Sequence, residues 1–310
     1  MEISFVIPCY NEAGNIIPLY EEIRSTFQAD TASYEFVFVN DGSSDRTKEE
    51  LKELSDKADE AITCVHFSRN FGKEAAIYAG LSHASGEFTC LIDADLQHPP
   101  AVALEMYRKL KENPELDCVA AYQKDRKESA LLRFYKKTFY RMINGLSEVE
   151  FFPAASDFRV FRKNVREAVL SMKEYYRFTK GIFAFVGFET EYMPYEVRER
   201  LNGKSKWSFF KLFNYAVEGI VGYSTKPLRF ATVLGAVFSF ASVLLLLTLL
   251  VLAIVQAAFP EVLLTIGVIV LVGGLLMIEI GILGEYLMRT YMQGKDRPVY
   301  IVKEVWKGKD

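Results

Sequence analysis

Two long stretches near the end of the chain are almost free of charge, and they constrain the fold more than any other feature. Phe230 to Val255 contains no charged residue, and Val262 to Ile278 is a second such run that continues past Glu279 to Leu283. As a helix rising about 1.5 Å per residue, the first run is roughly 39 Å long, enough to cross a hydrocarbon core of about 30 Å. We therefore expect two transmembrane helices, over about 230–255 and 262–288.

Charges around these runs predict their orientation. Lys226 and Arg229 precede the first run, Arg289 follows the second, and the connection from Gln256 to Glu261 has no Lys or Arg. Because cytoplasmic flanks of membrane helices are enriched in basic residues, both long ends are expected in the cytoplasm. Glu279 lies inside the second run, where an acid either pairs with a neighbouring helix or subunit or takes part in function.

From residue 1 to about 125, short β-branched runs alternate with amphipathic stretches. Strands are predicted at Ile3–Ile7, Phe36–Val39, Ile62–Phe67, Phe88–Ile92 and Cys118–Tyr122, and helices at Ile16–Phe27, Asp45–Lys57, Lys73–Ala84 and Ala101–Lys111. Alternation of this kind predicts an α/β fold, a mostly parallel sheet with helices on both faces.

The segment from about 126 to 225 is less regular. It contains a basic, aromatic helical stretch around 130–144, a predicted strand at Phe158–Phe161 and an aromatic helix at Trp207–Tyr223. That helix leads directly into Lys226, so we expect it to lie in the membrane interface, where aromatic and basic side chains are favoured. The expected organisation is a soluble domain over 1–206, interface helices over 207–228, two membrane helices within 229–289 and a cytoplasmic tail over 290–310.

Charge and cysteine content exclude some classes of protein. The net charge of −3 and the pI near 5.8 argue against sequence-independent nucleic-acid binding, which needs a basic surface. The stretch from Met1 to Pro8 has no basic leader, so no signal peptide is expected there. The four cysteines form no CxxC pair and are expected to be buried and reduced: Cys9, Cys64, Cys90 and Cys118.

Polar residues follow four of the predicted strands, at Asn11–Glu12, Asn40–Asp45, Ser68–Asn70 and Asp93–Asp95. Because ligands of such sheets bind outside the carboxyl ends of the strands, these segments are expected to form one cleft. Asp93 and Asp95 are two residues apart on an extended segment, so both side chains point the same way and can share one hard cation. Mg²⁺ or Mn²⁺ bound in this way keeps positions open for diphosphate oxygens.

Four ordered motifs resemble those of glycosyltransferase family 2, and more narrowly its branch of dolichyl-phosphate mannose synthases and bactoprenol glucosyltransferases. They are Val6–Glu12, Val39–Thr47, Ser68–Lys73 and Asp93–Pro100. The resemblance covers the whole chain, because that branch commonly has a GT-A catalytic domain, an interface helix, two spans and a short tail like Arg297–Ile301. It implies a GT-A domain over 1–206 on the cytoplasmic side of the cell membrane and a homo-oligomer, with a tetramer favoured.

The resemblance also implies roles for the matching residues. The donor nucleotide sugar would be bound by Pro8, Tyr10, Glu12, Asp41 and Lys73, with Asp41 accepting hydrogen bonds from the base or ribose. Asp93 and Asp95 would hold the Mg²⁺ or Mn²⁺ against the diphosphate, and Gln97 would contact sugar or phosphate nearby.

Several of these residues have a structural interpretation as well. Glu12 is also explained as a helix-start carboxylate and Asp45 as an N-cap. His98, before two prolines, is either a ligand or a residue that packs the loop.

Asp157 matches the family position that faces the acceptor. Because a phosphate monoester is largely a dianion at pH 7, it needs little deprotonation, and we expect Asp157 to orient the acceptor, metal or sugar. The repulsion between two anionic reactants would be offset by basic residues at Arg126, Arg133, Arg200, Lys204 and Lys206. For Lys204, a basic face that meets anionic lipid headgroups is the alternative.

The implied reaction is an inverting sugar transfer to a polyprenyl phosphate, with UDP-glucose and undecaprenyl phosphate as the favoured pair, for modification of a cell-envelope glycan. Transfer from GDP-mannose, as in dolichyl-phosphate mannose synthases, stays open, and so does a non-catalytic membrane adaptor. A processive polysaccharide synthase is disfavoured, because the chain has only two apolar runs and no Gln-x-x-Arg-Trp motif.

Overall fold

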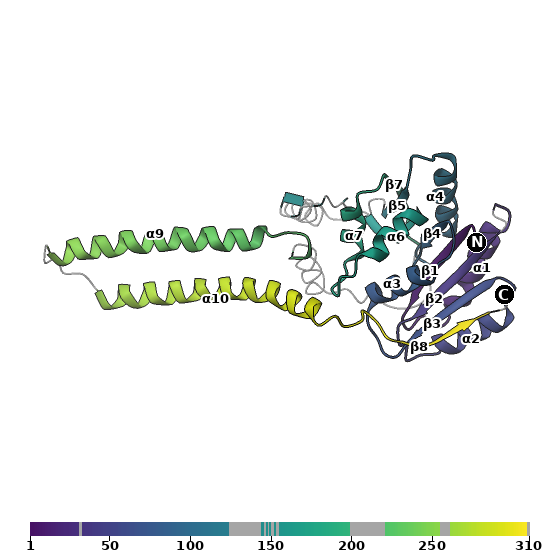
Figure 1. Ribbon diagram of the computed structural model, residues 1–310, viewed down its shortest axis with the longest axis horizontal. Coiled ribbons are helices and arrows are strands. Elements are labelled where there is room, and N and C mark those ends of the chain that lie inside the picture. Colours follow the sequence, from purple (N-terminus) through teal and green to yellow (C-terminus); the bar gives the residue numbers. More distant parts are fainter. Residues whose placement is uncertain are drawn as a thin grey trace.

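The computed structural model describes residues 1–30, 33–123, 144, 145, 147, 149, 152, 155–198, 221–254 and 261–308. An α/β domain lies at one end of the molecule and a pair of long helices extends from it (Figure 1). Both the first and the last strand belong to the α/β domain. In the sequence, the two long helices are therefore inserted between strands of that domain rather than following it.

Among the described residues, eight strands form one sheet in the order β7-β5-β6-β4-β1-β2-β3-β8. The strands are β1 (Ile3–Cys9), β2 (Tyr34–Asn40), β3 (Ala61–Phe67), β4 (Phe88–Leu91), β5 (Cys118–Gln123), β6 (Ala155–Arg162), β7 (Thr190–Tyr195) and β8 (Val302–Lys307). Strand β1 pairs in parallel with β2 and β4, as do β2 with β3 and β5 with β7. The pairs β3–β8, β4–β6 and β5–β6 are antiparallel. The predicted α/β fold with a mostly parallel sheet is thus confirmed.

Helices cover both faces of the sheet. One face packs against α1 (Ile16–Phe27), α2 (Thr47–Lys57) and α4 (Pro100–Glu112), and the other against α3 (Lys73–His83), α6 (Lys163–Ser171) and α7 (Thr179–Val186). In α1 the buried residues recur at three- and four-residue spacing, from Ile16 to Phe27, which is the pattern of a helix with one apolar face.

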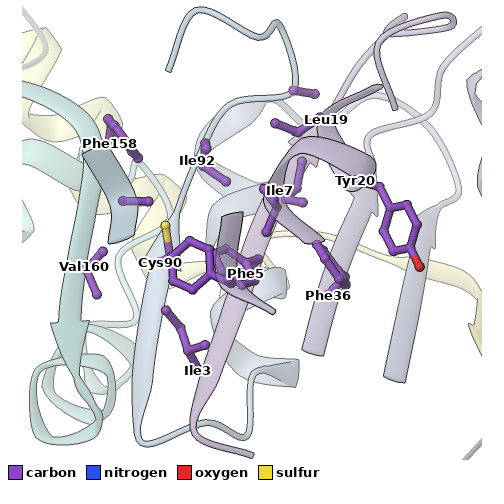
Figure 2. Close-up of a cluster of buried hydrophobic side chains, with 14 of the residues drawn as sticks. Ile3, Phe5, Ile7, Leu19, Tyr20, Phe36, Cys90, Ile92, Phe158 and Val160 are labelled. Atoms are coloured by element: carbon purple, nitrogen blue, oxygen red, sulfur yellow. The ribbon is translucent and has the colours of Figure 1, made fainter. Parts of the chain in front are cut away.

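Alternation along β1 divides the core between the two faces. Phe5 and Ile7 point into the layer of α1 and α4, where Phe5 stacks on Phe36 with ring centroids 5.5 Å apart (Figure 2). Val6 points into the opposite layer with α3. Each fully buried side chain of this size stabilises the fold by about 1.5–3 kcal/mol. The sheet is therefore a stable scaffold that positions the loops at its carboxyl edge.

The two long helices are α9 (Lys226–Ile254) and α10 (Glu261–Gly294), and they lie side by side (Figure 1). Their segments Lys226–Leu245 and Thr265–Gly294 have mean hydropathies of 1.9 and 2.6, and almost none of either is buried. By length and composition both are able to cross a membrane, as predicted for about 230–255 and 262–288. The predicted interface helix at 207–223 falls almost entirely outside the described residues.

The segment expected to be a cytoplasmic tail forms strand β8 at the edge of the sheet, antiparallel to β3. The backbone N–H of Ser68 donates to the Ile301 carbonyl at 3.0 Å, and that of Gly308 donates to Ile62 at 2.8 Å. The ring of Tyr300 stacks on Phe67 with centroids 4.9 Å apart. Hydrogen bonds and ring contacts therefore connect α10 to the far edge of the sheet. Neither β8 nor β7 was predicted as a strand from the sequence.

All four cysteines are buried and free, as expected.

Candidate active site

A cavity of about 320 Å³ opens at the carboxyl ends of β1, β2 and β4. Its wall also includes the loop that leads into α3, at Asn70, Gly72 and Lys73. The structure brings together on this wall seven of the residues predicted from the sequence: Pro8, Tyr10, Glu12, Asp41, Lys73, Asp93 and Asp95. Gln97 and Asp157 are not among the lining residues.

Lys73 links the cavity to Asp157. Its Nζ lies 2.7 Å from Asp93 Oδ1 and 2.9 Å from Asp157 Oδ2. The two carboxylates face each other because β4 and β6 are antiparallel: Leu91 lies opposite Arg159, and the same register carried on by two residues puts Asp93 opposite Asp157. One ammonium group therefore bridges two carboxylates from neighbouring strands.

The charges in this cluster favour the ionised forms. Burial alone raises the pKa of Asp157, but the positive charges of Lys73, Lys180 and Arg159 outweigh it and hold that pKa well below its usual range. Burial by itself lowers the pKa of Lys73, but the carboxylates of Asp157 and Asp93 outweigh this effect and raise that pKa. Asp157 is therefore a carboxylate and Lys73 an ammonium at neutral pH.

The donor set suits a hard divalent cation. Asp157 Oδ1 is buried and has no hydrogen-bond partner among the described residues, so within that part of the chain this oxygen retains its capacity to accept. The Lys73 ammonium already occupies the position of a cation between Asp93 and Asp157. In the described part of the chain, no three His, Cys, Asp or Glu side chains converge on one point. One or two carboxylates completed by phosphate oxygens are the ligands that Mg²⁺ takes in such sites, so the residues fit the group.

The turn after β4 fixes the orientation of Asp95. Leu96 has a φ of 61°, and the N–H of Gln97 donates to Asp95 Oδ1 at 3.1 Å. The Gln97 side-chain amide donates to the backbone carbonyl of Arg198 at 3.2 Å, so it ties the turn to the segment after β7. A contact of Gln97 with sugar or phosphate stays a prediction.

His98 packs behind the two carboxylates. Its ring stacks on Phe158 at a centroid distance of 4.7 Å, and its Nδ1 accepts a hydrogen bond of 3.3 Å from the N–H of Asp93. Burial lowers the pKa of His98, which favours the neutral ring that this bond requires. Of the two interpretations given for His98, the structure matches packing of the loop.

Asp41 holds the loop that carries Lys73. Its carboxylate is buried and accepts hydrogen bonds from the N–H groups of Phe71, at 2.6 Å, and Gly72, at 3.0 Å. Gly42 has a φ of +62°, and a Cβ there would lie 2.5 Å from the carbonyl carbon of Arg69. Asp41 therefore shapes the cavity through the loop, whereas its predicted bond to a base or ribose stays a prediction.

Asp45 and Glu12 connect the loops after β1 and β2. Asp45 Oδ1 accepts the N–H of Thr47 at 3.0 Å, at the start of α2, and Oδ2 accepts the N–H of Ala13 at 3.1 Å. Glu12 Oε2 accepts a hydrogen bond of 2.7 Å from Asn15, just before α1. Asp45 thus binds the first N–H of α2, although Arg46 and not Asp45 is the N-cap residue of that helix. Glu12 lies before α1 but bonds the Asn15 side chain rather than a helix N–H, and it also lines the cavity.

Three charged residues of the site were not identified from the sequence. Lys180 and Arg159 act on Asp157 from α7 and β6, and Glu74 accepts a hydrogen bond of 2.8 Å from the N–H of Thr179. Burial, together with the charge of Asp157, raises the pKa of Glu74 to about 7. A signal was present for Glu74, which directly follows Lys73 at the start of a predicted helix.

Five basic residues predicted for the phosphates lie outside the described residues, so their roles stay predictions: Arg126, Arg133, Arg200, Lys204 and Lys206.

Comparison with known proteins gives consistent matches. The model of the family described as Glycosyl transferase family 2 matches residues 4–170. The prophage bactoprenol glucosyl transferase homolog of Escherichia coli (strain K12) is 36% identical, over 99% of this chain and 100% of the relative. The bactoprenol glucosyl transferase of Shigella phage SfII is 36% identical, over 99% of each. A solved structure of glucosyl-3-phosphoglycerate synthase from Mycobacterium tuberculosis, in complex with Mn²⁺ and uridine-diphosphate-glucose, aligns with a TM-score of 0.49 and 17% identity, over 71% of this chain and 77% of that one.

Proposed function

Because the chain belongs to glycosyltransferase family 2 and its α/β domain is of the GT-A type, we propose that it transfers a sugar from a nucleotide diphosphate to a polyprenyl phosphate at a membrane. The relatives named bactoprenol glucosyl transferase support this acceptor, since each is 36% identical over nearly the whole chain. UDP-glucose and undecaprenyl phosphate are the favoured pair. GDP-mannose is the alternative donor.

The proposed reaction is one displacement. A phosphate oxygen of the lipid attacks the anomeric carbon, the bond from that carbon to the diphosphate breaks, and the nucleoside diphosphate leaves with the bonding electrons. Because the attack comes from the face opposite the leaving group, an α-linked donor gives a β-linked polyprenyl monophosphate sugar. The attacking phosphate is largely a dianion at pH 7, so the step needs no strong base.

Asp93 and Asp95 would hold Mg²⁺ or Mn²⁺, which when bound neutralises charge on the departing diphosphate. Lys73 supplies a second positive charge at the same edge of the cavity, 2.7 Å from Asp93. Asp157 stays ionised and orients Lys73 through the 2.9 Å contact with Nζ. Tyr10 is 41% exposed on the cavity wall, where its ring would stack on the base of the nucleotide.

For the membrane, we propose that α9 and α10 form a transmembrane hairpin with both ends in the cytoplasm. Basic residues support this orientation, because Lys226 and Arg229 lie at the start of α9 and Arg289 near the end of α10. The proposed organisation keeps a catalytic domain over 1–206, interface helices over 207–228 and membrane helices within 229–289. Strand β8 then brings the final segment back to the catalytic sheet.

The observation that carries the proposal is the bridge from Asp93 through Lys73 to Asp157 beside the cavity at the strand ends. The test is transfer of radiolabelled sugar from a panel of UDP- and GDP-sugars into organic-extractable undecaprenyl phosphate, with and without Mg²⁺ or Mn²⁺. We expect labelling from UDP-glucose that requires metal and is abolished by Asp95→Ala. Folded protein that binds a donor but labels no lipid would favour the adaptor, and normal turnover by Asp95→Ala would refute the metal assignment.

A further inference from the structure

Helix α7 contacts the two elements that carry Lys73 and Asp157, which are α3 and β6. Thr179, the first residue of α7, contacts α3, and Phe183, one turn later, contacts β6. Neither Thr179 nor Phe183 lines the donor cavity at the ends of β1, β2 and β4. Helix α7 is therefore placed to fix the catalytic residues from outside that cavity, through its contacts with two neighbouring elements.

Glu74 binds the start of α7 through a single oxygen. Its Oε2 accepts a hydrogen bond of 2.8 Å from the N–H of Thr179 and a second hydrogen bond from the Thr179 hydroxyl. The first N–H groups of a helix have no partner within the helix, and the positive end of the helix dipole favours an acid there. Because Thr179 is buried, loss of this oxygen would leave both donors without a partner and shielded from water. The start of α7 is thus fixed to the residue that follows Lys73.

Arg177 holds the chain just before α7 independently of Glu74. Its guanidinium carbon lies 4.1 Å from the centre of the Tyr78 ring, one turn along α3 from Glu74. The same guanidinium donates to the backbone carbonyls of Val169 and Met172 at the end of α6. The segment that leads into α7 is therefore held by α3 and α6 as well. Removal of the Glu74 side chain is expected to displace the start of α7 without releasing the whole segment.

At the second contact, Arg159 connects α7 to Asp157. The buried guanidinium of Arg159 lies over the ring of Phe183, with its central carbon 4.0 Å from the ring centre. Its Nε donates to the backbone carbonyl of Asp157 at 3.3 Å, and Nη2 donates to that of Ser156 at 2.9 Å. A cation over an aromatic face contributes about 2 kcal/mol when it is desolvated. Phe183 therefore sets the place of Arg159, and Arg159 fixes the backbone that presents the Asp157 carboxylate.

These contacts form a closed network across α3, α7 and β6 that begins and ends on adjacent residues of α3. Its members are, in order, Glu74, Thr179, Phe183, Arg159, Asp157 and Lys73. Such a network restricts each member more than an open chain of contacts does, because a shift at one contact has to be taken up at the others. The Lys73 ammonium at its end also lies 2.7 Å from Asp93. The network therefore sets the position of a positive charge at the donor cavity.

We propose that Glu74 is a positioning residue for sugar transfer, which binds the start of α7 and thereby holds Asp157 and the Lys73 ammonium in place at the departing diphosphate. This inference rests on the proposed function and adds to it a residue that lies outside the donor cavity. Glu74 acts through its accepting oxygen and not through its charge, because both hydrogen bonds from Thr179 end on one oxygen. The carbonyl oxygen of a glutamine offers the same acceptor.

The first test compares sugar-transfer kinetics of the full chain in detergent for the wild type, Glu74→Ala and Glu74→Gln. A displacement of about 1 Å in a catalytic group can cost on the order of 100-fold in rate, so Glu74→Ala is expected to lower kcat by about 10- to 100-fold. The KM values for donor and lipid are expected to change by less than about 3-fold, since loss of a transition-state interaction lowers kcat alone. Glu74→Gln is expected to recover most of kcat. Wild-type kcat in Glu74→Ala would overturn the proposal, and so would equal losses in the two variants, because charge and not the hydrogen bonds would then matter.

A double variant tests whether Glu74 acts through the network. Phe183→Leu keeps an apolar side chain but removes the ring that lies against Arg159. Effects of two independent substitutions on kcat multiply, whereas residues of one network share their effect. Glu74→Ala/Phe183→Leu is therefore expected to lose little more kcat than the more damaging single variant, and multiplied losses would overturn the proposal. Glu167→Ala is the matched control, because Glu167 is an exposed acid on α6 that pairs with Lys163.

Thermal unfolding without donor or lipid separates this inference from the proposed function. Lys73 occupies the position of a cation between Asp93 and Asp157, so displacement of its ammonium opens that position. Mn²⁺ is therefore expected to raise the unfolding midpoint more in Glu74→Ala than in the wild type or Glu74→Gln. If this difference appears but no donor supports transfer, the proposed function fails and Glu74 still positions Lys73. Equal Mn²⁺ shifts in the wild type and Glu74→Ala would overturn the inference, and the proposed function would stand wherever the wild type transfers sugar.

Discussion

The carboxylate of Glu279 on α10 lies directly against Gly235 on α9, in the space that a side chain at position 235 would fill. A Cβ at Gly235 would be 2.8 Å from Glu279 Oε1. Small residues let membrane helices approach closely, and an acid in such a helix is stabilised when a neighbouring helix covers it. The structure thus matches the interpretation in which Glu279 contacts a neighbouring helix.

Enlarging Gly235 is expected to separate the hairpin. Gly235→Leu forces Glu279 away and should destabilise the detergent-solubilised protein by about 1–3 kcal/mol, as overpacking does. Gly235→Ala should cost less, because the contact is with the end of a flexible side chain. Gly267→Leu is the control, since a Cβ there meets no atom of the described residues within 4 Å. Thermal unfolding measures the effect, and equal midpoints for the two leucine variants would contradict it.

Removal of Lys73 is expected to make stability depend on a divalent cation. Lys73→Ala leaves Asp93 and Asp157 facing each other without the ammonium between them, which should cost about 2 kcal/mol because Lys73 is partly exposed. A cation that binds only the folded state at 100 times its Kd restores about 2.7 kcal/mol. Mn²⁺ should therefore raise the unfolding midpoint more in Lys73→Ala than in the wild type. The same rise in both proteins would show that Lys73 does not compete with the cation, and no rise in either would count against the cation site. Arg108→Ala, which loses an exposed pair with Asp30, serves as the control for loss of an ion pair.

Glu74 is expected to make the fold less stable as pH rises. The folded carboxyl has a pKa of about 7 and the unfolded one titrates near 4.5, so the unfolded chain loses its proton first between these values. Glu74→Gln cannot ionise and keeps the acceptor for Thr179. Between pH 5 and pH 8 the variant should gain about 1–3 kcal/mol over the wild type. Denaturant unfolding at both pH values checks this, with Glu53→Gln on the surface of α2 as the matched control; a constant difference would refute it.

Strand β8 is expected to stabilise the domain through Trp306. Its ring lies 4.0 Å from that of His66, and the ammonium groups of Lys48 and Lys52 lie 5.3 and 5.5 Å from the Trp306 ring. Trp306→Ala should cost about 2 kcal/mol, less than a fully buried tryptophan. Lys303→Ala, an exposed position on the same strand, is the control. Thermal unfolding followed by circular dichroism should separate the two variants, and equal midpoints would show that the tryptophan contacts add no stability.

Much of the sheet was predictable because its signals are local. Residues 3–9 are apolar except for Ser4 and are buried on both faces, which is typical of a central parallel strand. The apolar spacing from Ile16 to Phe27 predicted α1 with its observed bounds. The polar residues at the strand ends were predicted to share one cleft, because the carboxyl ends of parallel strands all lie at one edge of the sheet.

Other parts of the site depend on pairing between distant segments. Asp157 meets Asp93 only because β6 inserts antiparallel between β4 and β5, and no local pattern encodes that order. Asp41 was predicted at the cavity, but the sequence gives no sign that Phe71 and Gly72 would use both of its oxygens. Val302 to Lys307 mixes apolar and charged residues without strict alternation, and its partner β3 is separated from it in the chain by both long helices.

The position of β8 has a consequence for how the protein is made. The ribosome completes β3 well before β8, and both long helices are synthesised between them. Until residues 302–307 emerge, β3 is an open sheet edge with unpaired backbone groups, which other chains are able to join. Synthesis of the hairpin therefore precedes closure of the sheet. A finished sheet is therefore one whose two long apolar helices have already been translated, so the order of the chain itself places completion of the α/β domain last.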